Sequence, residues 1–309
     1  MDYNKLRAHL AILLANIIFG LGVPITKLLL DEWVSPMTYM ATRSLGAAVI
    51  FWTIASLMNP EQVERRDLLV IMFGGLMGFV ISQTLTAWAL DYTSPVYFSL
   101  IATLTPVAVM LTAALFIGER ITSLKSLGVL LGIAGTVLMV FMSQASGSGS
   151  NDLLGISLAI LSVLTWAIYM IITRKVAQKY TSMTQMKYVF LVSAIVTVPI
   201  AWPELSDQKL YALSTLGWDG VAEMAFIVLM ATVLGYFLIP FSMRSLSATT
   251  VSVYTNLQPI VASFVAIIIG QDRLTWDKPI AALLVLASAC IVTVTTTGER
   301  STKTAEKTK

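Results

Sequence analysis

Cysteine, histidine and charge are all scarce in this chain of 309 residues. One cysteine, Cys290, and one histidine, His9, exclude a disulfide framework and any metal site built from several thiolates or imidazoles. Only 12% of the residues are charged and 57% are hydrophobic, whereas a soluble domain has about 25% charged residues. The lipid bilayer must therefore be the main solvent. The net charge of +3 is too small to indicate nucleic-acid binding, and the sequence predicts no cofactor.

Long apolar runs dominate what remains, and about 20 such residues suffice to cross the hydrocarbon core. The first run is interpreted as a retained helix, because it lacks the small-residue cleavage site of a signal peptide. The predicted fold class is an all-α integral membrane protein with ten transmembrane helices. The predicted spans are Arg7 to Leu29, Pro36 to Leu57, Leu68 to Leu90, Pro95 to Ile117, Leu124 to Met142, Leu153 to Thr173, Met186 to Trp202, Val221 to Met243, Ala248 to Gly270 and Pro279 to Thr296.

Basic residues predict the orientation of these spans. With a cytoplasmic N-terminus, only Lys27, Lys209, Arg273 and Lys278 fall outside, and every other Lys and Arg except the intramembrane Arg43 falls inside. This asymmetry follows the positive-inside rule. We therefore expect a multi-pass protein of the cell inner (cytoplasmic) membrane with both termini in the cytoplasm.

One element is repeated at an offset of 153 residues. The segment SPVYFSLIATLTPVAVMLTAALFIGER, from Ser94, aligns without a gap with SATTVSVYTNLQPIVASFVAIIIGQDR, from Ser247. The aligned prolines are Pro106 and Pro259, and the Met37-Thr38 pair of the second span has a counterpart in Met183-Thr184. The predicted units are a first repeat at 1–143, a linker at 144–152, a second repeat at 153–297 and a disordered tail at 298–309.

Five spans in each repeat force the two copies to face opposite ways across the membrane. Inverted repeats place a binding site near the midplane, between the halves, and let the site open to each side in turn. We therefore expect alternating access.

Four segments carry a resemblance to a known family: NIIFGLGVPITK, the intramembrane Arg43, WALDYTSPVYFSLIATLTPVAVMLTAALFIGER and GVLLGIAGTVLMV. Together they resemble the EamA repeat of the drug/metabolite transporter superfamily, and the resemblance covers nearly the whole chain as two units. The second unit departs from the pattern at GQDR, where Asp272 replaces the glutamate, and at LTWAIYMIITRK. The resemblance implies a ten-helix carrier of small metabolites, often an exporter.

Polar residues form a stripe around each repeated proline. Helical spacing places Ser252, Thr255, Asn256 and Pro259 on one face, and their counterparts include Ser99, Thr103 and Pro106. A proline leaves the carbonyl four residues earlier without its helical donor, so the prolines are predicted helix kinks. Such a stripe either lines a polar cavity or packs against a neighbouring helix, and the sequence leaves both open.

Further candidates for substrate binding combine amides with aromatic rings. A site with aromatic rings and a few polar groups suits a mostly apolar organic solute. Aromatic side chains in membrane helices also pack against other helices or face lipid, so this alternative stays open. The candidates are Asn16, Phe19, Gln83, Trp88, Trp166, Tyr169 and Tyr236.

Arg43 lies about 10 Å inside the second span, counted at 1.5 Å per residue. An arginine at that depth costs about 2.5 to 3.5 kcal/mol on insertion scales and marks a site by default. Asp91 and Glu223 lie toward the same outer side, so either could form a gating ion pair with Arg43. Direct binding of an anionic substrate group is the alternative.

Several functional questions stay open at the level of sequence. The scarcity of titratable groups leaves proton coupling, exchange for a counter-solute and uniport as alternatives. Gly128 and Gly132 have the GxxxG spacing that allows close helix contact, so a monomer or a weak homodimer is expected. We expect a small-molecule transporter, with a non-transporting membrane protein or a membrane-embedded enzyme for a lipid-soluble substrate as the alternatives.

Overall fold

The computed structural model describes residues 3–118, 152–212, 217–246 and 248–270, with isolated positions between 127 and 134 and between 279 and 291. No strand occurs in these residues. Most of the predicted fifth and tenth spans, most of the linker, the tail and Gly128 and Gly132 lie outside the described residues. The described helices are α1 (Tyr3–Glu32), α2 (Pro36–Ser56), α3 (Arg65–Gly75), η1 (Leu76–Ile81), α4 (Ser82–Tyr92), α5 (Pro95–Ala102), α6 (Thr105–Ile117), α8 (Asp152–Ile172), α9 (Arg174–Lys179), α10 (Ser182–Ala201), η2 (Trp202–Asp207), η3 (Lys209–Tyr211), α11 (Trp218–Phe226), η5 (Ile227–Gly235), α12 (Tyr236–Met243), α13 (Ala248–Val253), η6 (Tyr254–Leu257) and α14 (Gln258–Ile268).

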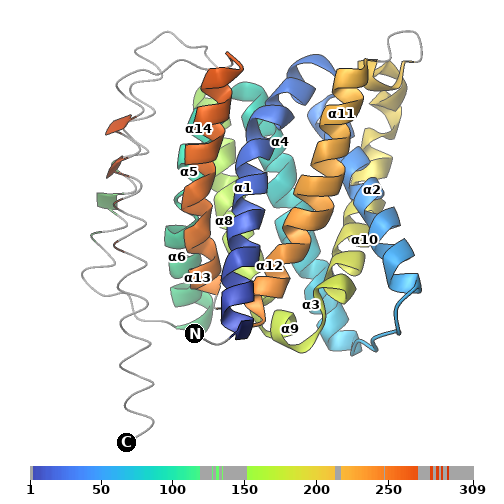
Figure 1. Cartoon of the computed structure of the whole chain (residues 1–309), viewed down its shortest axis with the longest axis vertical. Coiled ribbons are helices and arrows are strands. Elements are labelled where there is room, and N and C mark those ends of the chain that lie inside the picture. The colour runs from blue at the N-terminus through green and yellow to red at the C-terminus, as the bar shows by residue number, and fades with distance from the viewer. Residues whose placement is uncertain are drawn as a thin grey trace, which may run out of the picture.

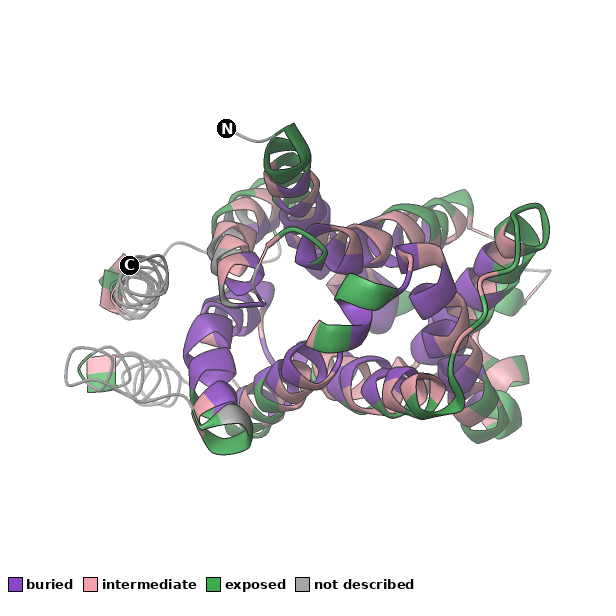
Figure 2. Ribbon diagram, turned by 90° about the horizontal axis from the view of Figure 1, so that it is seen from below, coloured by how far each residue is buried: buried purple, intermediate pink, exposed green. Residues whose placement is uncertain are grey.

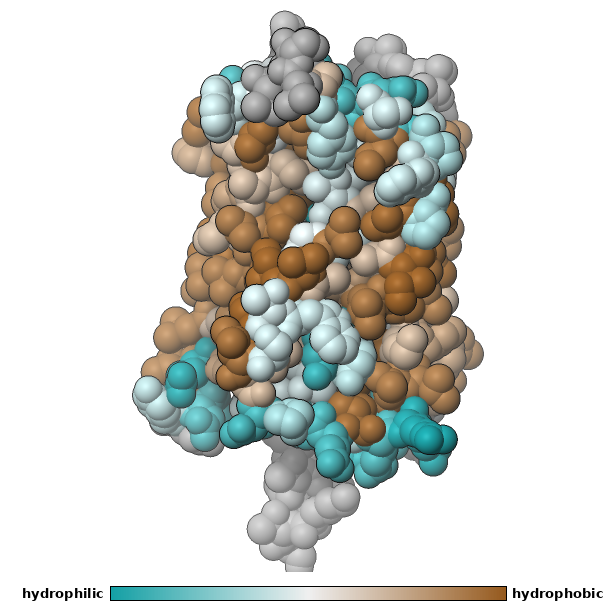
Figure 3. All heavy atoms as spheres, turned by 90° about the vertical axis from the view of Figure 1, so that its right-hand side faces the viewer, coloured by the Kyte–Doolittle hydropathy of each residue, from teal (hydrophilic) through white to brown (hydrophobic). Residues whose placement is uncertain are grey.

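The helices have the length and composition of membrane spans. In the described part of the chain, six helical stretches are long and apolar enough to cross a bilayer. The predicted second span ends within one residue of the end of α2, while the seventh begins four residues too late, because α10 starts at Ser182. In Figure 3, a broad band of hydrophobic residues covers much of one face, and hydrophilic residues gather mainly at its lower edge. The protein is a multi-pass membrane protein.

Corresponding stretches of the two repeats run in opposite directions. In Figure 1, α3 leads upward into α4, whereas α11 leads downward into α12. The proline-containing stretches show the same reversal, since α5 leads down to α6 while α13 leads up to α14. Viewed from below in Figure 2, buried residues face the interior of the group of helices and exposed residues lie mainly on its outside.

The helix starts follow from local capping chemistry. At Ser35, Ser94 and Thr181 the side-chain oxygen accepts a hydrogen bond from the backbone N–H three residues later. A proline follows each serine, where its fixed φ suits the first helical turn.

The caps of α2 and α10 are also held by the opposite half of the chain. Ser35 Oγ donates to Glu204 Oε1 at 2.8 Å, and its backbone N–H donates to Gln208 Oε1 at 2.6 Å. Thr181 Oγ1 donates to Glu61 Oε2 at 2.8 Å, and its N–H donates to the same oxygen at 3.1 Å. Ser35 and Thr181 are separated by the same spacing as Met37 and Met183. The two repeats therefore clamp each other at both ends of the molecule.

The interface between α2 and α10 repeats this reciprocity. Ser44 Oγ and Thr197 Oγ1 share a hydrogen bond at 2.7 Å. In the Met37-to-Met183 register their counterparts are Phe190 and Phe51, whose rings stack with centroids 5.5 Å apart. The contact between Ser44 and Thr197 thus recurs between the equivalent positions, Phe190 and Phe51. Contacts that recur in this way are typical of two halves related by a two-fold axis.

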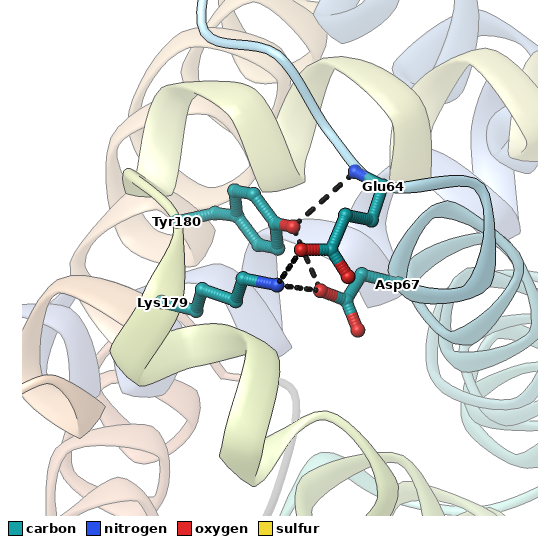
Figure 4. A network of polar contacts seen from close by, with 4 residues as sticks. All are labelled: Glu64, Asp67, Lys179 and Tyr180. Carbon is teal, nitrogen blue, oxygen red and sulfur yellow. Dashed lines mark hydrogen bonds and ion pairs between the residues drawn. The ribbon is translucent and has the colours of Figure 1, made fainter.

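A charged network joins the lower end of α3 to α9 (Figure 4). Lys179 Nζ lies 2.8 Å from Glu64 Oε1 and 2.7 Å from Asp67 Oδ2, and the Tyr180 hydroxyl donates to Asp67 Oδ2 at 2.7 Å. Hydrogen bonds to Asp67 and Glu64 raise the pKa of Lys179 above its ordinary value. These contacts fix the connection at this end of the helices, while the exposed pair of Lys179 with Glu64 adds little stability on its own.

The proline of the first repeat interrupts its helix. The helix tightens before Pro106, where the Thr103 N–H bonds Leu100 O and the Leu104 N–H bonds Ile101 O, three residues back in each case. Pro106 cannot donate to the carbonyl of Ala102, and the Thr105 hydroxyl donates to that carbonyl instead, at 2.6 Å. The kink is therefore satisfied inside its own helix.

The second repeat breaks its helix at the corresponding place. The 3₁₀ segment Tyr254–Leu257 separates α13 from α14 just before Gln258. Both kinked helices end alike, since Gly118 and Gly270 adopt φ values of 69° and 75°. That left-handed conformation is the usual helix C-terminal cap and favours glycine.

Candidate binding cavity

A cavity of about 130 Å³ lies among helices of both repeats. Its walls come from α1, α2, α4, α5 and α6 of the first half and from α8, η5, α12, α13, η6 and α14 of the second. An engineered cavity of about 150 Å³ in another protein accepts benzene, so this space suits a small organic group. The predicted site residues that line it are Asn16, Phe19, Arg43, Gln83, Trp166, Tyr236, Ser252 and Thr255.

Other predicted residues lie away from the cavity wall. Trp88 is on the outside of α4, with 39% of its surface exposed. Ser99 and Thr103 are fully buried in helix packing, and Thr103 Oγ1 donates to the carbonyl of Leu100 at 2.6 Å. Tyr169 is buried behind Trp166, their ring centroids 4.8 Å apart. The side chains of Asn256 and Pro259 lie outside the described residues, whereas Pro106 is buried.

Two cavity residues occupy equivalent positions in the two repeats and touch each other. Gln83 and Tyr236 are 153 residues apart, which is the repeat offset, and the Tyr236 hydroxyl donates to Gln83 Oε1 at 2.5 Å. A π-helical segment, η1 or η5, comes shortly before each of them. Since a π turn adds a residue to the helix and rotates the side chains after it, both segments help to aim this pair.

Arg43 reaches this pair from α2. Its Nη1 donates to Gln83 Oε1 at 3.3 Å and to the Tyr39 hydroxyl at 3.2 Å, while Nε donates to Thr232 Oγ1 at 3.2 Å. The guanidinium also lies 5.3 and 5.5 Å from the ring centroids of Tyr39 and Tyr236. Arg43 is 5% exposed, and it is the one charged residue among the described residues that line the cavity.

The expected ion pair of Arg43 with Asp91 or Glu223 does not form. The described partners of Arg43 are neutral oxygens, and the backbone carbonyl of Asp91 accepts a hydrogen bond from Lys27. Glu223 Oε2 is buried without a hydrogen-bond partner in the described part of the chain. Depth along a helix was readable from sequence, but the direction in which each side chain points was not.

An aromatic cluster supports one side of the site. Phe79, which sequence reasoning missed, packs edge-on against Trp166, Tyr169, Phe190 and Tyr236 at centroid distances of 5.6, 5.3, 5.0 and 4.7 Å. Edge-to-face pairs are the favourable arrangement for such rings. Phe79 itself is 2% exposed, so it holds Trp166 and Tyr236 in place from behind.

Two close contacts between helices near the cavity require glycine. A Cβ at Gly78 would lie 2.5 Å from the Tyr169 ring, and a Cβ at Gly20 would lie 2.7 Å from the Val261 side chain. Only glycine lets these backbones come so near.

Polar contacts tie α1 to the second proline helix. Gln258 Nε2 donates to Asn16 Oδ1 at 2.7 Å, and Asn16 Nδ2 donates to the carbonyl of Ile12 at 2.8 Å. Nearer the lower end, His9 Nδ1 and the Tyr254 hydroxyl are 2.7 Å apart. Gln258 was not among the predicted site residues, although its amide, like that of Asn256, is costly in lipid and favoured a polar cavity along this stripe.

Hydroxyl groups line another part of the wall and were also missed. Ser162 Oγ is 2.7 Å from Thr86 Oγ1 and 3.3 Å from Ser82 Oγ, and Ser82 Oγ donates to the Ser162 carbonyl at 2.9 Å. These contacts join α4 to α8. Isolated serines and threonines are too common in membrane helices to stand out in one sequence.

Similarity to known proteins covers nearly the whole chain. The EamA-like transporter family matches twice, at residues 6–141 and 153–294. The uncharacterized transporter YvbV of Bacillus subtilis is 23% identical over 291 residues, which is 93% of this chain and 92% of that protein. An uncharacterized transporter of Archaeoglobus fulgidus is 25% identical over 292 residues, covering 93% and 97%.

Two further comparisons extend this likeness. A protein of Streptantibioticus cattleyicolor named a probable terminal-alkyne amino-acid exporter is 21% identical over 227 residues, 74% of this chain and 73% of that one. A solved crystal structure shares the fold with a TM-score of 0.62 at 19% identity, covering 94% of this chain and 97% of that chain. The resemblance seen in the sequence is thus confirmed, and the chain belongs to the EamA-like transporter family as two EamA repeats.

Proposed function

We propose that the protein is a ten-helix carrier that exports small organic metabolites or amino-acid-like solutes across the cytoplasmic membrane by alternating access. Both termini are cytoplasmic in this proposal, and the repeats divide at the 144–152 linker. The exporter named from Streptantibioticus cattleyicolor supports an amino-acid-like substrate and the outward direction.

The contact between Gln83 and Tyr236 carries the proposal. Repeat-equivalent positions meet only at the axis that relates the two halves, so the cavity they line lies where inverted repeats place a transport site. The surrounding wall is mostly apolar with a few polar groups, which is the usual character of sites for organic ligands.

Transport is tested in vesicles with the purified chain. We expect uptake of some members of a panel of amino acids, nucleosides and drugs, and Gln83→Leu should abolish most of that flux. Trp88→Leu, on the outside of the same helix, is the matched control and should retain it. Repeating the assay with and without a pH gradient or an internal counter-solute separates proton coupling, exchange and uniport. No flux for any solute from folded protein would contradict the carrier proposal.

Alternating access has its own test in Cys290→Ser protein. Thr26 and Ile239 both line the cavity. Thr26 lies in the last two turns of α1, whose C-terminal end is at the top of Figure 1, and Ile239 lies in α12, toward which α11 leads downward. Single cysteines there should be labelled from opposite sides of the membrane, and a transported solute should change the two rates in opposite senses. Parallel changes at both positions would exclude alternating access.

A further inference from the structure

Arg43 has hydrogen-bonding capacity that the protein leaves unused. A guanidinium carries five N–H groups, and Arg43 has four neutral oxygens as hydrogen-bond partners, those of Thr232, Tyr39, Gln83 and Tyr236. At least one N–H group of Arg43 therefore has no acceptor of its own among the described residues. Because Arg43 is buried and lines the cavity, this remaining donor capacity can serve a ligand that enters it.

The charge of Arg43 is also unbalanced within the described residues. No carboxylate lies within ion-pair distance of it, and Tyr39, Gln83 and Thr232 supply only neutral oxygens. A permanent cation in a low-dielectric interior attracts an anion far more strongly than it would in water. Such a cavity favours an anion and disfavours a cationic amine.

The shape and charge of the cavity narrow the ligand further. One guanidinium balances one negative charge, and its planar fork matches the two oxygens of a carboxylate. A phosphate dianion would leave a charge unpaired. The rings of Phe19 and Trp166 and the side chain of Ile239 offer an apolar wall to the rest of the molecule.

We propose, resting on the proposed function, that the substrates are small organic monoanions whose carboxylate binds the guanidinium of Arg43. The apolar part of the ligand lies against the aromatic wall of the cavity. Arg43 is then the residue that selects substrates by charge.

The proposal is tested by ligand-induced stabilisation of the purified full-length protein. Butyrate, hexanoate, phenylacetate and indole-3-acetate are compared with their amides, and phenylacetate is also compared with phenethylamine. At least one acid should raise the melting temperature while its amide and the amine do not. Arg43→Gln should weaken that acid's binding roughly ten- to a hundredfold, the value of a charge-assisted hydrogen bond. Arg43→Lys keeps the positive charge but loses the planar guanidinium, so its affinity for the acid should lie between those of the wild type and Arg43→Gln.

Arg65→Gln is the matched control, because Arg65 is an exposed cation at the start of α3 and away from the cavity. It should bind the acid as the wild type does. The comparison of acids with amides needs only wild-type protein, so it stands even if Arg43→Gln fails to fold. Equal stabilisation by an acid and its amide, no stabilisation by any acid, or undiminished binding by folded Arg43→Gln overturns the proposal.

The outcome separates this inference from the carrier function. Vesicle flux of neutral or cationic solutes without acid binding would leave the carrier in place and remove the role of Arg43 in recognition. Acid binding without flux of any solute would keep the role of Arg43 in recognition and remove the carrier function.

Discussion

In the first repeat, the carbonyl that Pro106 leaves without a helical donor accepts from Thr105, the residue just before the proline. In the second repeat, the residue just before the proline is Gln258, and its amide reaches out of its own helix to Asn16 on α1. The same helix break is closed on itself in one half and linked to a neighbouring helix in the other. Two copies of one element have thus become a self-contained kink and a joint between helices.

The joint should be the more sensitive of the two to mutation. Gln258→Leu removes the donor to Asn16 Oδ1, and polar contacts between membrane helices contribute about 0.6 kcal/mol on average and up to about 1.7 kcal/mol. We expect a loss of stability in that range and a fall in flux of tenfold or more, measured by thermal unfolding in detergent and by vesicle uptake. Asn16→Leu added to Gln258→Leu should cost less than the sum of the single changes. Full additivity would show that the contact carries no coupling.

The C-terminal caps should not distinguish the two repeats. Gly118→Ala and Gly270→Ala each place a Cβ on a left-handed residue, which costs about 1 to 2 kcal/mol for an L-residue. The surroundings are open at both positions, so no steric term is added. Thermal unfolding should give similar losses for the two variants. A much larger loss at one cap would mean that the two helices do not end equivalently.

Removing the first repeat's internal donor tests the self-contained kink. Thr105→Val leaves the Ala102 carbonyl without its hydroxyl partner and should cost about 1 kcal/mol of unfolding free energy. Pro106→Ala restores a backbone N–H, so in that background Thr105→Val should cost clearly less. Thr105→Ser is the conservative control and should unfold as the wild type does. An equal cost of Thr105→Val in both backgrounds would contradict the assignment.

The smallest effect is expected at the clamp on the cap of α10. Partial burial alone would raise the pKa of Glu61, but hydrogen bonds from Thr184 and Thr181 outweigh it and hold that pKa below its ordinary value. The stability contributed by Glu61 is therefore full above the ordinary glutamate pKa and is lost as the pH falls through the lowered value. Its size should be about 0.5 kcal/mol or less, because the group is only partly buried and solvent screens its interactions.

Thermal unfolding of the wild type and Glu61→Gln as a function of pH measures this contribution. The difference between them should shrink on acidification, while Glu204→Gln reports on the corresponding clamp of α2. A difference that grows at low pH would reverse the assigned sign.

The sequence predicted where the helices lie better than it predicted which of their side chains face the cavity. The apolar runs located α2 closely, because hydropathy alone determines what crosses a bilayer. The stripe around Pro106 was harder to interpret, since Ala102 and Thr105 line the cavity whereas Ser99 and Thr103 are packed away from it. A serine or threonine can satisfy itself on its own helix, and nothing in one sequence shows which of them does so.

The centre of the site was predicted only in part. Gln83 and Tyr236 were selected as amide and aromatic candidates at matching depths, but their contact was not foreseen. The π-helical segments that help to aim them leave no mark in the hydrophobic pattern. Arg43 was recognised as costly in lipid, yet two of its neutral partners, Gln83 and Thr232, depend on the rotation of two other helices, which only the fold defines.

The pairing of Gln83 with Tyr236 has a consequence for the energetics of turnover. In the proposed alternating-access cycle, exchanging the conformations of the two halves maps this pair of positions onto itself, so its contribution should be nearly the same whether the site faces one side or the other. Substitutions of Gln83 or Tyr236 should therefore change the rate of turnover without changing the relative populations of the two conformations. The hydrogen bond between Asn16 and Gln258 has no such image, because Thr105 stands in place of Gln258 in the first repeat, so weakening it shifts the resting population toward one face.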